Sequence, residues 1–190
     1  MHPIHPRTTM VRRRTVPAAA VCLSVAGLLM MPGPGTGQDH GHPEGDASRL
    51  GAVTFPVSCD APVTRAFERA VAMLHSFWFE AATREFEAVV DADPDCAMGR
   101  WGIAMTMMGN PMARTPPSSE RQRIGRAAAE RARALAERTT ERERMYADAV
   151  VAYYAEEDAG FSERMAAHEA AMRALHEAFP DDPEATTFYA

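Results

Sequence analysis

The strongest constraint on the fold of this chain is an internal repeat of 34 residues. Apolar positions recur at this single offset, and both copies follow the i, i+3, i+4, i+7 spacing of one helix face. The matched pairs are Phe67 with Trp101, Ala70 with Ala104, Val71 with Met105, and Leu74 with Met108. A repeat of this length is typical of helical hairpins that stack on one another. The sequence therefore predicts an all-α array.

Start and stop signals predict six helices and the beginning of a seventh. A proline opens or ends a helix, and a Ser or Thr followed three residues later by Glu or Gln has the spacing of a capping box. The signals in chain order are Asp60 with Pro62, Asp93-Pro94, Gly109-Asn110-Pro111, Ser119 with Gln122, Thr140 with Glu143, Gly160, and Pro183.

Residues 63–96 resemble a tetratricopeptide repeat. The matching positions are the small Ala70, the aromatic, small and aromatic Phe79, Ala82 and Phe86, and the terminal Pro94. Residues 74–79 and 95–105 also resemble a group of exported bacterial proteins with such repeats. The resemblance implies antiparallel helix pairs stacked into a right-handed superhelix. Its concave groove would be lined by the first helix of each pair.

The resemblance also implies a set of groove residues. These are Phe67, Val71, Leu74, His75, Met98, Trp101, Met105 and Met108. Trp101 and Phe67 stand one place later than the usual family tryptophan, so part of the set belongs to the core. Such a groove favours a hydrophobic peptide or the chain's own Phe55-Pro56-Val57. We therefore expect a non-catalytic scaffold that binds a protein or peptide and carries no cofactor.

Residues 1–37 have the pattern of a secretory signal peptide. Arg12, Arg13 and Arg14 precede an apolar run over 16–31, and a Pro/Gly-rich stretch follows. The alternative is an uncleaved membrane anchor. Cleavage would remove four arginines and no acidic residue, so the net charge would change from −6 to −10. Residues 38–58 then form a polar tether with an extended lead-in, and residues 59–190 form the repeat domain.

The predicted mature chain would be periplasmic or extracellular and would contain no membrane span. Its acidic balance argues against nucleic-acid binding. Cys59 and Cys96 are its two cysteines, and an oxidising compartment favours a disulfide between them. The alternative is a reactive thiol, which would need a neighbouring cation, whereas Asp60 and Asp95 are the neighbours present.

Two further readings of the sequence stay open. The first is extracytoplasmic copper handling by a methionine-rich stretch together with His40 and His42, since thioether ligands suit Cu(I). The methionines of that stretch are Met98, Met105, Met107, Met108 and Met112; packing is the favoured reading, because Met105 and Met108 occupy repeat core positions. The second reading is the N-terminal part of a larger, enzyme-associated protein. The seventh helix begins at Glu184 without a polar capping face, so the natural chain is expected to continue beyond Ala190.

Overall fold

The computed structural model describes residues 50–190, which are all-helical and contain no β-strand. The α-helices of this part are α1 (Thr64–His75), α2 (Phe79–Ala92), α3 (Ala97–Met108), α4 (Ser119–Ala136), α5 (Glu141–Tyr154), α6 (Phe161–Ala178) and α7 (Pro183–Tyr189), with 3-10 turns at Ala61–Val63 and Pro111–Ala113. This confirms the all-α expectation for these residues. The predicted signal peptide and His40 and His42 lie outside the described residues.

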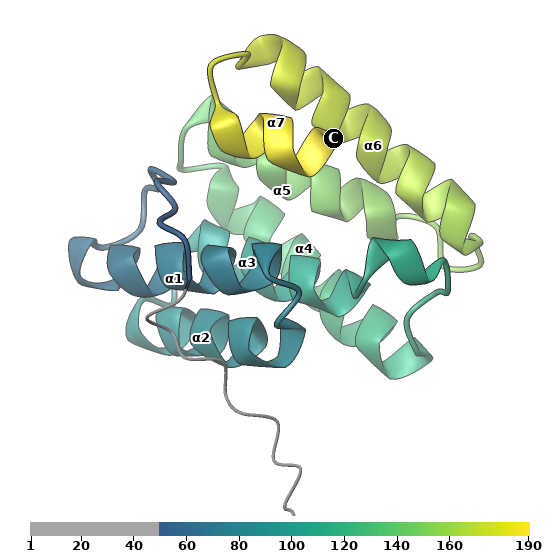
Figure 1. Ribbon diagram of the computed structural model, residues 1–190, viewed down its shortest axis with the longest axis horizontal. Helices are drawn as coiled ribbons and strands as arrows, with labels where there is room; N and C mark the ends of the chain where they lie inside the picture. The colour runs from purple at the N-terminus through teal and green to yellow at the C-terminus, as the bar shows by residue number, and fades with distance from the viewer. Residues whose placement is uncertain (1–49) are drawn as a thin grey trace, which may run out of the picture. The chain divides into compact units, whose positions relative to one another are not determined.

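Each helix packs against the next one in the chain, and the odd-numbered helices also lie side by side (Figure 1). α3 contacts both α1 and α5 in addition to its sequence neighbours α2 and α4. α7 packs on α6. Residues 53–58, which we call the lead-in, contact α1 and α5 through hydrogen bonds. The odd-numbered helices therefore share one face, and the lead-in lies on it.

The helix starts agree with the sequence signals to within a few residues. Thr140 and Glu143 form the expected capping box at the start of α5. Ser118 rather than Ser119 caps α4, because its extended backbone lets its hydroxyl accept the Arg121 N–H. Asp60 makes no side-chain cap, since a 3-10 turn separates it from α1.

The predicted helix stripes form one continuous hydrophobic core. Glycines permit close approach at two crossings within it. A Cβ at Gly102 would overlap the Phe86 ring, and one at Gly125 would overlap Tyr154. These glycines therefore set the distance between α3 and α2 and between α4 and α5.

Two basic side chains, Arg164 and His168, are buried around the α5–α6 hairpin. Arg164 donates to the carbonyl oxygens of Tyr153, Glu157 and Ala159, and so holds the connecting loop. His168 lies 3.0 Å from the Ala149 carbonyl oxygen through Nδ1. His168 is therefore a hydrogen-bonded core histidine, with Nδ1 as the donor. Burial lowers the pKa of His168, and the hydrogen bond to Ala149 acts in the opposite direction.

Gly102→Ala should destabilise the fold, because its new methyl group must displace the Phe86 ring. Overpacking of this kind costs about 1–3 kcal/mol. Urea unfolding followed by circular dichroism measures the change. Gly51→Ala is the matched control, since a Cβ there meets no atom within 4 Å. Equal midpoints for the two variants would contradict this packing.

The stability of the fold should fall as the pH is lowered below about 6.5, the ordinary pKa of histidine. The pKa of His168 is lowered in the folded chain, so the unfolded chain binds the proton first. The contribution of neutral His168 to the stability of the fold is complete above the pKa that this residue has in the unfolded chain. It is lost as the pH falls towards the lower pKa of His168 in the folded chain. Urea midpoints at pH 7.5 and 5.5 should differ more for the wild type than for His168→Gln. His176→Gln, at a partly exposed site, should keep the wild-type dependence.

Candidate binding face

Each odd-numbered helix contributes an aromatic ring to the face that the odd helices share. The rings are Phe67 from α1, Trp101 from α3, Tyr146 from α5 and Phe188 from α7, and we call this set the aromatic face. The Phe55 ring of the lead-in lies 5.4 Å from Phe67, 5.6 Å from Trp101 and 5.0 Å from Tyr146, between ring centroids. Tilted and edge-on rings at such separations attract one another.

The lead-in places a single ring on this face because its backbone is extended. Side chains of an extended chain alternate in direction. Phe55 is fully buried, whereas Thr54 and Pro56 on either side of it are exposed. Pro56 also disfavours helical backbone at Phe55. One aromatic anchor is thus inserted while its neighbours face outward.

Charged side chains of α1 and α5 hold the main chain of the lead-in. The Phe55 N–H donates to Glu68 over 3.2 Å, and Arg142 donates to the Pro56 carbonyl oxygen over 2.9 Å. The Ser58 N–H donates to Glu143 over 2.7 Å. The Arg142 guanidinium also lies 4.5 Å from the centroid of the Phe55 ring. Because these bonds reach backbone atoms, most extended segments could form them.

Asp182 links the start of α5 to the start of α7. It accepts hydrogen bonds from Arg142 over 2.6 Å and from the Tyr146 hydroxyl over 2.9 Å, and it caps α7 through the Glu184 N–H. Burial alone would raise the pKa of Asp182. The hydrogen bonds from Arg142 and Tyr146 and the charge of Arg142 outweigh burial and hold that pKa below its ordinary value. Burial, together with the Asp182 charge, strongly raises the pKa of Tyr146.

His75, at the end of α1, joins α1 to α7. Its Nε2 lies 2.6 Å from a Glu184 carboxylate oxygen, and its ring stacks on Phe188 with centroids 4.8 Å apart. These contacts bring the start and the end of the described chain together over Trp101, which Phe188 contacts at 5.4 Å.

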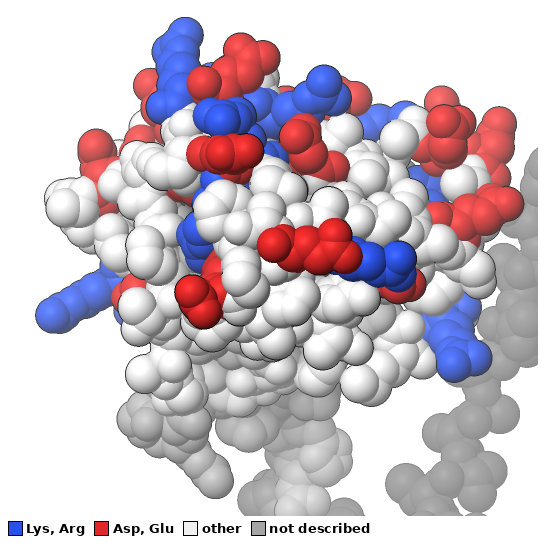
Figure 2. All heavy atoms as spheres, turned by 90° about the horizontal axis from the view of Figure 1, so that it is seen from above, with Lys and Arg blue, Asp and Glu red and all other residues white. Residues whose placement is uncertain are grey.

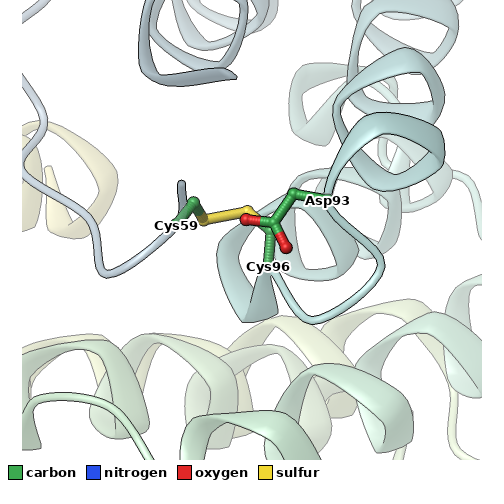
Figure 3. Close-up of side chains that lie close together, drawn as sticks. All are labelled: Cys59, Asp93 and Cys96. Atoms are coloured by element: carbon green, nitrogen blue, oxygen red, sulfur yellow. A yellow bond between two sulfur atoms is a disulfide. The ribbon is translucent and has the colours of Figure 1, made fainter. Parts of the chain in front are cut away.

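A disulfide joins Cys59, directly after the lead-in, to Cys96 at the start of α3 (Figure 3). The Asp93 carboxylate lies beside it and accepts the N–H groups of Asp60 and Asp95. Potential ligand atoms of Cys59, Asp93 and Cys96 lie within 4.8 Å of one another. Sulfurs bonded to each other offer no thiolate, so these residues do not form a metal site while the disulfide is present.

Most of the residues expected in the groove are buried, and two of them, Phe67 and Trp101, belong to the aromatic face. Phe67, Val71, Met98 and Trp101 are at most 1% exposed, and Leu74 and Met105 are also buried. Phe67 and Trp101 contact Phe55, and His75 contacts α7. Met108 is half-buried. Of the other methionines of the copper reading, Met107 is buried and Met112 is exposed.

The predicted groove set did not include four residues that contact the lead-in from α1 and α5. These are Tyr146, Glu68, Arg142 and Glu143. A pocket of about 680 Å³ lies beside these residues. Its walls are the lead-in from Thr54 to Ser58, the start of α5 and residues 178–183. The walls are mostly apolar, with Arg142, Glu143, Asp181 and Asp182 as their charged members.

On the face shown in Figure 2, Arg side chains and acidic side chains are interspersed, and neither sign forms a continuous patch. Comparison of the chain with protein-family models, curated proteins and solved structures found no match. Within residues 50–190, no helix combines the length and the apolar character needed to cross a membrane.

Asp182→Asn should destabilise the protein at neutral pH, because it leaves Arg142 without its charged partner in a largely buried place. Breaking such a pair costs about 3–5 kcal/mol. The lowered pKa means that this contribution is present above about pH 4, the ordinary Asp value, and is lost as pH falls through the folded pKa. The difference from wild type in urea unfolding should therefore be large at pH 7 and small near pH 2.

The exposed neighbour Asp181 supplies the matched control, and Asp181→Asn should leave the unfolding curve at pH 7 unchanged. A difference between wild type and Asp182→Asn that persists undiminished at low pH would show that the charge of Asp182 is not the cause.

Proposed function

We propose that this chain is a non-catalytic interaction module of the tetratricopeptide-repeat type, whose aromatic face binds an extended segment of a protein or peptide. The observation that carries the proposal is the seating of Phe55 among rings from α1, α3 and α5. The chain's own lead-in demonstrates the chemistry that this face accepts: one inserted ring and an extended backbone.

The contacts between the lead-in and the aromatic face support the proposal that a short segment binds there. Full burial of a phenylalanine side chain contributes about 1.5–3 kcal/mol. Aromatic pairs add about 0.5–1.5 kcal/mol each beyond the area term. Glu68, Arg142 and Glu143 supply charge-assisted hydrogen bonds to the backbone, which fix the direction of the bound segment.

The assignment of a binding rather than a catalytic role rests on how the polar groups are used. Asp182, Glu143 and Arg164 are committed to hydrogen bonds that join helices or loops. His168 is buried and bonded to a backbone carbonyl oxygen. The Cys59–Cys96 disulfide is in keeping with an exported protein, since such bonds persist in oxidising compartments.

The proposal is tested with a synthetic peptide that copies residues 52–58. The peptide is titrated into a variant of the protein whose own lead-in no longer occupies the aromatic face. In Phe55→Asp an aspartate replaces the inserted ring, and a carboxylate is not stable among aromatic rings. Isothermal titration calorimetry should show binding of the peptide to this variant. A peptide with Ala in place of its Phe should bind at least about tenfold more weakly, which corresponds to about 1.4 kcal/mol.

Two further substitutions in the Phe55→Asp chain locate the site. Glu68→Ala removes the acceptor of a backbone N–H and should weaken binding about tenfold, since a hydrogen bond to a charged group is worth about 1.5–3 kcal/mol. Glu120→Ala, on exposed α4, should leave the affinity unchanged. If circular dichroism shows native helix content and no peptide binds, the aromatic face is not a ligand site and the proposal is rejected.

A further inference from the structure

The inference concerns the ligand class and the occupancy of the aromatic face, and it rests on the proposed function. We propose that the lead-in is an exchangeable internal ligand. The external ligand is then an extended segment with an aromatic residue followed by proline, and it takes the place of residues 53–57. The Cys59–Cys96 disulfide keeps the displaced lead-in attached to the protein.

The lead-in contributes one side chain to the buried core. Phe55 is its one fully buried side chain, while Thr54, Pro56 and Ser58 are exposed and Val53 and Val57 are half-buried. It forms no secondary structure, and two of the side chains that hold it, Glu68 and Arg142, are partly exposed, whereas Glu143 is buried. Segments of this kind open locally more readily than the helices around them.

The chemistry of the place that Phe55 and Pro56 occupy defines the competing ligand. The aromatic face holds one ring. Arg142 donates a hydrogen bond to the carbonyl oxygen of the residue that follows this ring. Proline at that next position has no N–H to satisfy and holds the chain in the extended form before binding. This preorganisation lowers the entropy lost on association.

The lead-in supplies no hydrogen-bond acceptor to the Trp101 indole. The Trp101 indole N–H is buried and has no hydrogen-bond partner among the described residues. Tryptophan N–H groups normally find an acceptor when buried. A foreign segment that brings a carbonyl or hydroxyl oxygen to this N–H gains a bond that the lead-in does not form.

The pocket beside the lead-in gives a ligand space to begin binding. It is bounded on one side by Thr54 to Ser58 and on the other by residues 178–183. Residues flanking the ligand's aromatic anchor can occupy this space before the lead-in leaves. After release, Cys59 remains bonded to Cys96, so the lead-in stays close to the face at high effective concentration.

Hydrogen exchange of the oxidised wild-type chain, measured by NMR, tests exchangeability without any variant. The amides of Phe55 and Ser58 donate to Glu68 and Glu143, so their exchange reports release of the lead-in. They should exchange at least about 100-fold faster than the helix amides of Trp101 and Met105, because release of a short segment costs less than unfolding. Exchange of the lead-in amides at the rate of global unfolding would show a fixed core segment and overturn the inference.

Competition with the peptide of residues 52–58 is the second measurement. The wild type should bind it at least about tenfold more weakly than Phe55→Asp, because the tethered lead-in competes. Replacing the peptide's proline by alanine should weaken binding to Phe55→Asp, whereas replacing its threonine by alanine should not. Equal affinity of wild type and Phe55→Asp would show that the lead-in does not occupy the ligand's place.

The outcomes separate this inference from the proposed function. Binding to Phe55→Asp together with a fixed lead-in in the wild type keeps the function and rejects exchange. Absence of binding to the folded variant rejects both. If Phe55→Asp does not fold, Phe55→Ala, which empties the seat without adding a charge, takes its place in the same titrations.

Discussion

The packing of aromatic rings around the Trp101 indole is the interaction on which the rest of this structure depends. Rings from every odd-numbered helix and from the lead-in meet there; in chain order its partners are Phe55, Phe67, Phe86, Tyr146 and Phe188. Each hairpin alone would expose its own apolar stripe to water, and the stripes become stable when neighbouring helices bury them together. The indole joins elements that the sequence separates by many residues.

The helices were predictable because their signals are local. The apolar stripe at Phe67 and the capping box at Thr140 need only neighbours within one or two turns. The error at the start of α4 also follows from the use of local signals. Ser118 and Ser119 are chemically equivalent, and only the backbone conformation selects which of them caps the helix. The right-handed superhelix stays a prediction, which comes from the repeat and from the family resemblance.

The aromatic face was only partly predictable, because its contacts are distant in sequence. Tyr146 lies 45 residues after Trp101, so a search at the 34-residue offset does not find it. Arg142 and Glu143 look like members of a solvated charged stretch. They acquire a role because a segment more than 80 residues earlier lies against them. Phe55 was recognised as apolar and extended, and the sequence left open whether a foreign peptide or the chain itself fills the groove.

The long-range bond between Ser58 and Glu143, 85 residues apart, has a consequence for the order of folding. Helical hairpins close short loops and form early, whereas contacts between distant residues must first overcome a larger loss of chain entropy. The lead-in is synthesised before helices α1 to α7, but its site among the rings is not complete until α5 exists. It is therefore expected to dock last, and a nascent chain that ends before residue 146 leaves Trp101 without two of its ring partners.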